Sequence, residues 1–518
     1  MERSWWREAV FYQIYPRSYQ DSDGDGVGDL RGIIDRLDHL NGTEASLGID
    51  AIWLSPFYPS PMADFGYDVA NYTDVDRIFG TLADADKLLA EAHRRSIRVI
   101  VDLVPNHTSD RHPWFVAARS RRDDPRRDWY VWADPGKGGG PPNNWIAVFG
   151  QKHKRPAWTL DPETGQYYLH HFLPEQPDLN WWNEDVRRAI DDVMRFWLDR
   201  GVDGFRVDVA HSLVKDPQLR DNPRFRFRGH RHPRNWDLDE VHEIHRRWRR
   251  VMDEYPERMA VGEVNPHDLR RLVRYYGNDD ELQLPFNFHF LEQPWRAESF
   301  RGVVEEWERL LPAHAWPDYT LSNHDRSRAA TRYGLGRARV AAMMLLTLRG
   351  TPFIYYGEEI GMTDVLVRPE RIVDVDGRDP ERTPMQWDAT PNAGFTGGTP
   401  WLPMAADAQK VNVEAQQGDP RSLLSIYRRL TTARRASPAL RLGSYRSLSA
   451  PRGVFAFVRE LDGERVFVAL NFTSHERAVT LPFARSRLLL STHDARGDLS
   501  ESRTFLSPDE GLIVREDR

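Results

Sequence analysis

The sequence of 518 residues contains no cysteine. This excludes a disulfide framework, a thiolate metal site and a cysteine nucleophile. The sequence also lacks any apolar run close to the roughly 18 residues that indicate a membrane helix. Its first residues, MERSWWREAVFYQIYP, contain no apolar stretch typical of a signal peptide. We therefore expect a cytoplasmic protein without a membrane-spanning segment.

Positive charge is in slight deficit, with 71 Lys and Arg against 78 Asp and Glu and a formal net charge of −7. Because nucleic-acid binding needs a basic surplus, we expect no nucleic-acid partner. The hydrophobic share of 40% is sufficient for a large core. The 18 Trp and 18 Tyr fill such a core or offer flat faces that stack on sugar rings, and composition leaves both interpretations open.

Short apolar segments alternate with helical patterns over most of the chain. The segment 185–200 is an example of a helix: its apolar residues recur at helical spacing and Gly201 follows as a stop signal. Eight segments are predicted as strands: Val10–Tyr15, Ala51–Leu54, Arg98–Leu103, Asp203–Asp208, Met259–Val264, Leu282–Phe286, Tyr319–Leu321 and Phe353–Tyr356. Eight strands alternating with helices predict an α/β fold, a (β/α)8 TIM barrel.

Two regions interrupt this alternation. A segment rich in Trp, Pro and Gly follows the third strand, and it is too long for a structureless loop. Near the C-terminus, VFAFVREL, Asp-Gly and VFVALNF predict a hairpin. We therefore expect a barrel formed by 1–105 and 180–436, an inserted subdomain at 106–179, and a C-terminal antiparallel β domain resembling a sandwich at 437–518.

The segment GVDGFRVDVAHS at 201–212 is the most informative for chemistry. Strand side chains alternate between faces, so Arg206 and Asp208 point the same way. In a barrel strand, that direction is toward the mouth. A carboxylate kept ionised by an adjacent guanidinium is suited to nucleophilic attack; a structural ion pair is the alternative.

Three other predicted strands end in polar side chains at the same rim. The fifth ends at Glu263, the seventh at His324 and Asp325, and the third at Asp102, with Asn106 and His107 just beyond. Two carboxylates on either side of a scissile bond are what glycoside hydrolysis requires. The spacing alone does not say which carboxylate has which role.

The segments DLVPNHTS, GFRVDVAHS, GEV and SNHD resemble, in order and strand context, the four short regions of the α-amylase superfamily, glycoside hydrolase family 13. QPDLN at 176–180 resembles a fifth region in the form found in oligo-1,6-glucosidases and related α-glucosidases. The resemblance extends from VFYQIYPRSY through TPFIYYGEEIGM to DGRDPERTPMQWD.

By this resemblance, Asp208 is the expected nucleophile, Glu263 the general acid/base and Asp325 the stabiliser of the transition state. Asp102 is expected to lie behind these groups at the barrel mouth and to hold them in position. The substrate-binding residues that the resemblance implies are Asp64, Tyr67, His107, Phe149, Phe172, Gln176, Arg206, Val209 and His324.

The resemblance implies an exo-acting, retaining α-glucosidase that releases glucose from the non-reducing end of short α-glucosides such as maltose and isomaltose. Val209, directly after the expected nucleophile, favours action on α-1,6 bonds within this subfamily. A transglucosylase or an enzyme of the sucrose isomerase type would use the same residues, so this alternative stays open. A non-enzymatic relative is disfavoured because all three carboxylates are present.

The loop DSDGDGVGDL at 21–30 carries acidic side chains at alternate positions, and hard oxygen ligands suit Ca²⁺. The resemblance implies a structural Ca²⁺ held by Asp21, Asp23, Asp25, the Val27 carbonyl and Asp29. A solvated acidic turn is the alternative. Catalysis itself is expected to need no cofactor.

Two further segments invite a functional interpretation. HEIH at 242–245 does not have the spacing of a zinc-protease helix, and its charged surroundings favour a solvated helix face. The arginine-rich run RFRFRGHRHPR at 224–234 is predicted to be a loop near the barrel mouth, where it would shape the acceptor side.

Overall fold

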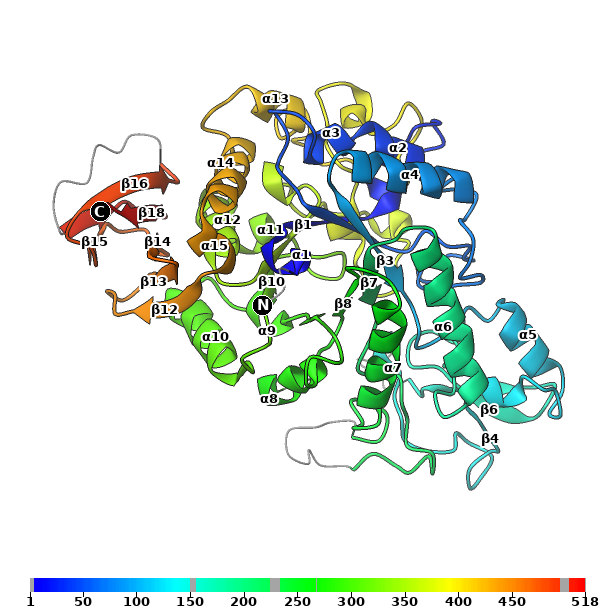
Figure 1. The fold of residues 1–518 in the computed structure, drawn as a ribbon. Helices are drawn as coiled ribbons and strands as arrows, with labels where there is room; N and C mark the ends of the chain where they lie inside the picture. The colour runs from blue at the N-terminus through cyan, green and yellow to red at the C-terminus, as the bar shows by residue number, and fades with distance from the viewer. Residues whose placement is uncertain (1–3, 150–154, 224–232, 267, 494–502, 518) are drawn as a thin grey trace.

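The computed structural model describes residues 4–149, 155–223, 233–266, 268–493 and 503–517. Within these ranges, eight parallel strands form one sheet in the order β10-β11-β1-β2-β3-β7-β8-β9. The strands are β1 Phe11–Ile14, β2 Ala51–Leu54, β3 Arg98–Leu103, β7 Gly204–Val207, β8 Met259–Gly262, β9 Leu284–Pro285, β10 Asp318–Thr320 and β11 Thr351–Tyr355. All eight predicted strands are confirmed, and the sheet curves into a nearly closed barrel (Figure 1).

Strand alternation divides the apolar residues of the barrel between two cores. Phe11, Trp53 and Ile100 belong to the core inside the barrel, whereas their neighbours Tyr12 and Ile52 pack outward against the helices. Further along several strands the inward positions change from apolar to polar, as from Phe11 to Gln13 in β1 and from Ile100 to Asp102 in β3. The interior therefore ends in charged groups at the C-terminal ends of the strands, where barrel enzymes build their sites.

Amphipathic helices surround the barrel. The long ones are α4 Leu82–Arg94, α6 Glu184–Asp199, α7 Val241–Asp253, α10 Ala297–Leu310, α12 Leu335–Thr347 and α14 Leu423–Ala436. The shorter ones are α1 Trp5–Glu8, α2 Leu30–Asp35, α3 Leu37–Leu40, α5 Pro113–Ser120, α8 Leu269–Leu272, α9 Phe288–Leu291, α11 Ala329–Tyr333, α13 Val413–Gln417 and α15 Pro438–Leu442. The predicted helix at 185–200 is α6; the Asn183 side chain caps its start, and Gly201 follows its end with φ of 97°.

The segment after β3, predicted to be an inserted subdomain, contains a small antiparallel sheet. Its strands are β4 Trp132–Ala133, β5 Trp158–Asp161 and β6 Gln166–Leu169, in the order β4-β6-β5. Trp145 and Trp158 stack on each other in a separate apolar cluster. Figure 1 places this small sheet beside α5 and α6, at the opposite end of the molecule from the C-terminal strands.

The C-terminal strands form a five-stranded sheet, β12-β13-β14-β18-β16, and a two-stranded sheet, β15-β17. Their bounds are β12 Ser444–Leu448, β13 Val454–Leu461, β14 Glu464–Asn471, β15 Arg477–Thr480, β16 Ser486–Ser491, β17 Arg503–Leu506 and β18 Gly511–Glu516. The predicted hairpin is confirmed: Asp462 and Gly463 both have positive φ, as a type I′ turn requires. Along β13, Phe455 faces the barrel-side core and Ala456 faces the smaller sheet.

The interpretation of HEIH as a solvated face is wrong. His242 and His245 are both buried on α7. His242 Nδ1 lies 2.7 Å from Glu281 Oε2, and His245 Nε2 lies 2.9 Å from the Ala210 carbonyl oxygen. The two histidines therefore fasten α7 to the barrel and do not form a metal site.

Most of the arginine-rich run at 224–234 lies outside the described residues, which exclude 224–232. None of the helices in the described ranges is both long and apolar enough to cross a membrane.

The close approach of β7 and β8 gives a first prediction. A Cβ added at Gly204 would lie 2.0 Å from the backbone oxygen of Met259, so the two strands would have to separate. Gly204→Ala is expected to lower the free energy of unfolding by on the order of 1–3 kcal/mol, as overpacking does. Thermal unfolding measures this effect.

The matched control is Gly302→Ala on α10, where an added Cβ meets nothing within 4 Å. This variant is expected to be neutral or more stable by up to about 1 kcal/mol, because alanine favours helix more than glycine does. Equal stability of Gly204→Ala and the unmodified protein would contradict the tight β7–β8 packing.

Candidate active site

Arg206 on β7 connects three carboxylates at the barrel mouth. Its Nη1 donates to Asp102 Oδ1 at 2.6 Å and to Asp208 Oδ1 at 2.7 Å, and its Nη2 donates to Glu263 Oε2 at 2.8 Å. Strand register explains the meeting, since Asp102 on β3 pairs with Arg206 and β8 ends just before Glu263. The side chain of Arg206 is only 1% exposed, so water screens these contacts little.

One buried cation does not neutralise three carboxylates, of which Asp102 and Asp208 are buried and Glu263 is partly buried. Burial raises the pKa of Asp102 to about 6, although Arg206 acts in the opposite direction. Burial and the neighbouring Glu263 also raise the pKa of Asp208, again against the effect of Arg206. Asp208 therefore holds its proton into a higher pH range than an isolated aspartic acid would.

The chain turns sharply after Asp208. Val209 has φ of 43°, an unfavourable left-handed conformation for a β-branched residue. In this conformation, the Val209 N–H donates to Glu263 Oε2 at 3.1 Å, and the next N–H, of Ala210, donates to the Glu263 carbonyl oxygen at 2.9 Å. The strained turn thus fixes Glu263 against Asp208. It also ends the strand alternation, so the Val209 side chain lines the pocket rather than the helix layer.

The carboxylates lie in a cavity of about 390 Å³. Ten of the twelve residues predicted for catalysis or substrate binding line it: Asp64, Tyr67, His107, Phe149, Phe172, Asp208, Val209, Glu263, His324 and Asp325. The other two, Gln176 and Arg206, lie behind the wall and hydrogen-bond to residues that line it. The fold therefore brings the whole predicted set together.

A polar network forms one side of the cavity. Asp64 accepts a hydrogen bond from Arg378 Nη2 at 2.5 Å and from Gln176 Nε2 at 3.0 Å. His107 Nε2 lies 3.0 Å from the same Gln176 nitrogen, and burial lowers the pKa of His107 to about 4. This side offers neutral and charged groups at fixed positions, as the hydroxyls of a sugar would require.

Tyr67 and His324 stack in parallel next to this network, with ring centroids 5.3 Å apart. The Tyr67 hydroxyl lies 2.7 Å from His324 Nε2 and donates to Asp102 Oδ2 at 3.1 Å. Burial keeps the pKa of His324 well below its usual value, so its ring is neutral. Tyr67 thus connects the polar side of the cavity to the carboxylates around Arg206.

Asp325 is held by two arginines that sequence reasoning did not single out. Arg378 Nη1 and Arg382 Nη2 donate to Asp325 Oδ1 at 3.1 and 3.0 Å. Although burial opposes ionisation, these two arginines hold the pKa of Asp325 well below its usual range. Both arginines follow β11 within DGRDPERTPMQWD, a segment that resembles the family but has no periodicity that marks individual residues.

Aromatic side chains complete the walls. Phe149 and Phe172 meet edge to face at 5.4 Å, and Arg378 lies over the Phe149 ring. Sequence reasoning did not identify two further aromatic residues that line the cavity, Trp236 and Phe288. They come from segments after β7 and β9 that carry no recognisable pattern.

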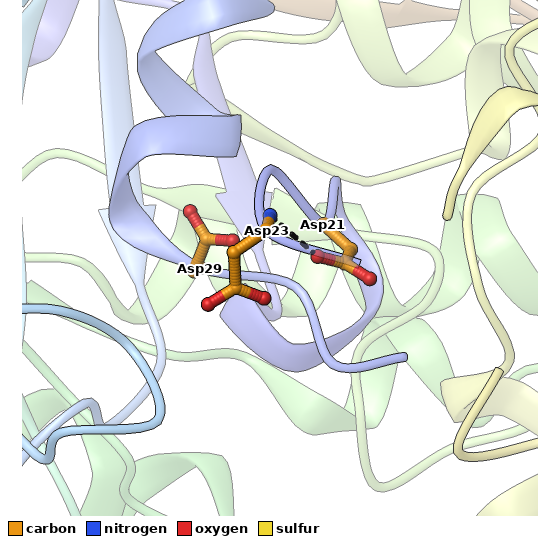
Figure 2. A group of neighbouring side chains, drawn as sticks. All are labelled: Asp21, Asp23 and Asp29. Atoms are coloured by element: carbon orange, nitrogen blue, oxygen red, sulfur yellow. Dashed lines mark hydrogen bonds between the residues drawn. The ribbon is translucent and has the colours of Figure 1, made fainter. Parts of the chain in front are cut away.

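The acidic loop lies away from this cavity. Asp21, Asp23 and Asp29 each direct a carboxylate oxygen to within 4.8 Å of the others (Figure 2). Asp21 and Asp29 are buried, and Asp23 is exposed. Burial opposes ionisation of Asp21, but hydrogen bonds from the Thr396 hydroxyl and backbone N–H groups outweigh it and lower its pKa. Asp25 is not part of this convergence within the described residues.

Comparison with known proteins agrees with this geometry. Residues 13–443 match the family model of the α-amylase catalytic domain. A probable α-glucosidase of Rhizobium meliloti is 43% identical, with 93% of this chain and 92% of that protein covered. An oligo-1,6-glucosidase of Parageobacillus thermoglucosidasius is 39% identical, with 95% and 96% covered.

Among solved structures, the α-glucosyl transfer enzyme XgtA superimposes with a TM-score of 0.93 at 40% identity, with both chains covered completely. Sequence and fold thus agree over nearly the full length. The chain belongs to the α-amylase family of glycoside hydrolases, close to the α-glucosidases and oligo-1,6-glucosidases.

Proposed function

We propose that this chain is an exo-acting, retaining α-glucosidase that releases α-glucose from the non-reducing end of short α-glucosides, including maltose, isomaltose and small oligosaccharides. The observation that carries the proposal is the contact of one guanidinium, that of Arg206, with both Asp208 and Glu263. A shared guanidinium favours the short separation of the two carboxyl groups that is typical of retaining enzymes, and so favours a covalent intermediate.

In the proposed reaction, Glu263 donates its proton to the glycosidic oxygen while an Asp208 oxygen attacks the anomeric carbon. The bond to the leaving group breaks, and a covalent glucosyl-enzyme forms. Glu263, now ionised, removes a proton from water, which attacks the anomeric carbon and releases Asp208. Arg206 stabilises the carboxylate that is ionised at each stage.

Asp325 is proposed to stabilise the positive charge of the transition state, because Arg378 and Arg382 keep it ionised. Asp64, Arg378 and His107 are proposed to bind hydroxyls of the terminal glucose, and Tyr67 to stack on its ring. Phe149, Phe172, Gln176, Val209 and His324 complete the proposed substrate site. The family resemblance implies a pocket closed on this side, which would admit only chain ends and so supports exo action.

The second candidate is a transglucosylase or an enzyme of the sucrose isomerase type. The similarity to the α-glucosyl transfer enzyme XgtA favours the transglucosylase. Both activities use the same intermediate and differ only in whether water or a sugar attacks it. The domain limits at 105, 180 and 437 and the cytoplasmic location remain part of the proposal.

A structural Ca²⁺ is proposed for the acidic loop. Three carboxylates that converge within 4.8 Å suit a hard cation. Asp21, Asp23 and Asp29 would hold the ion, with Asp25 and the Val27 carbonyl as additional ligands. Asp21 also accepts a hydrogen bond from Thr396. The ion would therefore strengthen the contact between this loop and the segment around Thr396.

Two substitutions test the catalytic roles. Asp208→Asn is expected to lower turnover by at least roughly 10⁴-fold, because an amide does not form the intermediate. Glu263→Gln is expected to slow disaccharide hydrolysis by about 10²–10⁴-fold. With α-glucosyl fluoride, which needs no acid, this second variant should release a burst of fluoride and then stall. Added azide should restart it with α-glucosyl azide as product. Substantial activity in Asp208→Asn would refute the mechanism.

The products from maltose, isomaltose and sucrose, incubated separately, test the reaction type and the linkage preference. Free glucose, first released as the α-anomer, is expected as the main product from isomaltose. Val209→Thr is expected to shift the preference toward maltose, since this side chain borders the cavity beside Glu263. If longer oligosaccharides or an isomerised disaccharide form in place of glucose, the enzyme is the second candidate, a transglucosylase or sucrose isomerase-type enzyme, and not a hydrolase.

Removal of Ca²⁺ tests the ion site. Chelation is expected to lower the melting temperature, and Ca²⁺ at about 100 times its Kd should restore about 2.7 kcal/mol of stability. Asp21→Asn should abolish this response, whereas the exposed Asp35→Asn should retain it. Activity well below the melting temperature should persist without the ion. A melting temperature that does not respond to Ca²⁺ would mean that the loop is a solvated turn.

A further inference from the structure

The side of the cavity next to Glu263 has its own set of residues. The leaving-group oxygen must face Glu263 if this residue protonates it, so the leaving sugar occupies this side. His211 Nδ1 lies 3.3 Å from the Glu263 carbonyl oxygen, and the His211 ring lies 5.0 Å from the ring of Trp236. Trp236 lines the cavity and is only partly buried. A flat indole at this place is suited to stack on the second sugar.

Trp236 is held between two fixed neighbours in the chain. The buried Asn235 donates through Nδ2 to His171 Nε2 at 2.7 Å and accepts from Asn222 Nδ2 at 2.7 Å. Asp237 accepts from the Tyr275 hydroxyl at 2.6 Å and pairs with Arg271. The backbone on both sides of the indole is therefore anchored before any ligand binds.

His171 also contacts Trp236 directly, with ring centroids 5.5 Å apart at an interplanar angle of 87°. Because Asn235 donates to Nε2, the His171 Nδ1–H donates to Asp178. Burial lowers the pKa of His171 more than Asp178 raises it, so the ring is neutral and this tautomer is fixed.

Asp178 is completely buried and is paired with Lys215. The Lys215 Nζ lies 2.7 Å from Asp178 Oδ2 and 2.7 Å from Asn106 Oδ1. His171 and Asp178 belong to the insert, whereas Lys215 and Asn235 belong to the segment between β7 and α7. A buried ion pair of this kind is a weak source of stability but a strong constraint on geometry. It locks the insert to the segment that carries Trp236.

We propose that Trp236 is the platform on which the leaving or attacking sugar stacks, and that the buried network of His171, Asp178, Lys215 and Asn235 positions it. This inference rests on the proposed function and names the residue that binds the second sugar. Trp236 contacts substrate, and Asn235 acts through Trp236. A disaccharide uses the platform for hydrolysis, and a sugar acceptor uses it for transfer. A leaving group of one atom does not reach it.

The test compares isomaltose with α-glucosyl fluoride in the full chain. For Trp236→Ala, kcat/KM for isomaltose is expected to fall roughly fivefold to tenfold relative to kcat/KM for the fluoride, the range that one stacking contact supplies. The share of transfer product with added methyl α-glucoside should fall in parallel. Trp236→Tyr, which keeps a flat ring, should recover most of the relative kcat/KM for isomaltose and most of the transfer product.

Asn235→Ala tests the positioning network while Trp236 remains in place. It is expected to raise KM for isomaltose more than it lowers kcat, and by less than Trp236→Ala does. The double variant should lose no more than Trp236→Ala alone, because both changes act through one contact. Melting temperatures confirm that each variant is folded.

The role of Trp236 as a platform would be refuted if Trp236→Ala lowered kcat/KM equally for isomaltose and α-glucosyl fluoride, or if the share of transfer product did not change. Additive effects in the double variant would overturn the role of Asn235. If the unmodified protein fails to hydrolyse α-glucosyl fluoride, the proposed function fails first, and this result is distinct from a failure of the platform.

Discussion

The contact of Arg206 with Asp102, Asp208 and Glu263 sets the conditions for the rest of the site. Three carboxylates from three neighbouring strands would repel one another without a cation between them. A guanidinium with donors in a fixed plane holds them at defined angles, which a flexible ammonium group does not. The barrel makes this possible because inward-facing positions of adjacent strands lie at the same level, as the pairing of Asp102 with Arg206 illustrates.

The charge balance around Arg206 also separates the roles of the carboxylates. Asp325 has the guanidinium groups of Arg378 and Arg382 beside it and is stably ionised. Asp208 shares one guanidinium with Asp102 and Glu263, and burial raises the pKa of Asp208. The uneven distribution of arginines therefore separates the ionisation of Asp325 from that of Asp208.

Much of the barrel and its charged centre was predictable from the sequence, because strand alternation and strand ends leave a local pattern. The two-residue spacing of Arg206 and Asp208 predicts that both side chains lie on the same face of the strand. The alternating acidic residues of the 21–30 loop predict a Ca²⁺ site. Arg378 and Trp236 lie in long loops, where only tertiary structure determines what a side chain contacts. HEIH was misinterpreted for a related reason: Glu281, the partner of His242, comes from a distant part of the chain.

The two sides of the cavity have different origins, and this difference bears on specificity. On the side of Asp64 and His324, Tyr67 connects the side chains directly to the Arg206 cluster, and Gln176 of the insert donates a hydrogen bond to Asp64. On the side of Trp236, side chains come from longer segments that depend on contacts with the insert. In the proposed function, hydrolysis and transfer use the first side in the same way. The choice between water and sugar would then be made on the second side, where a change in packing would alter the acceptor without disturbing the carboxylates.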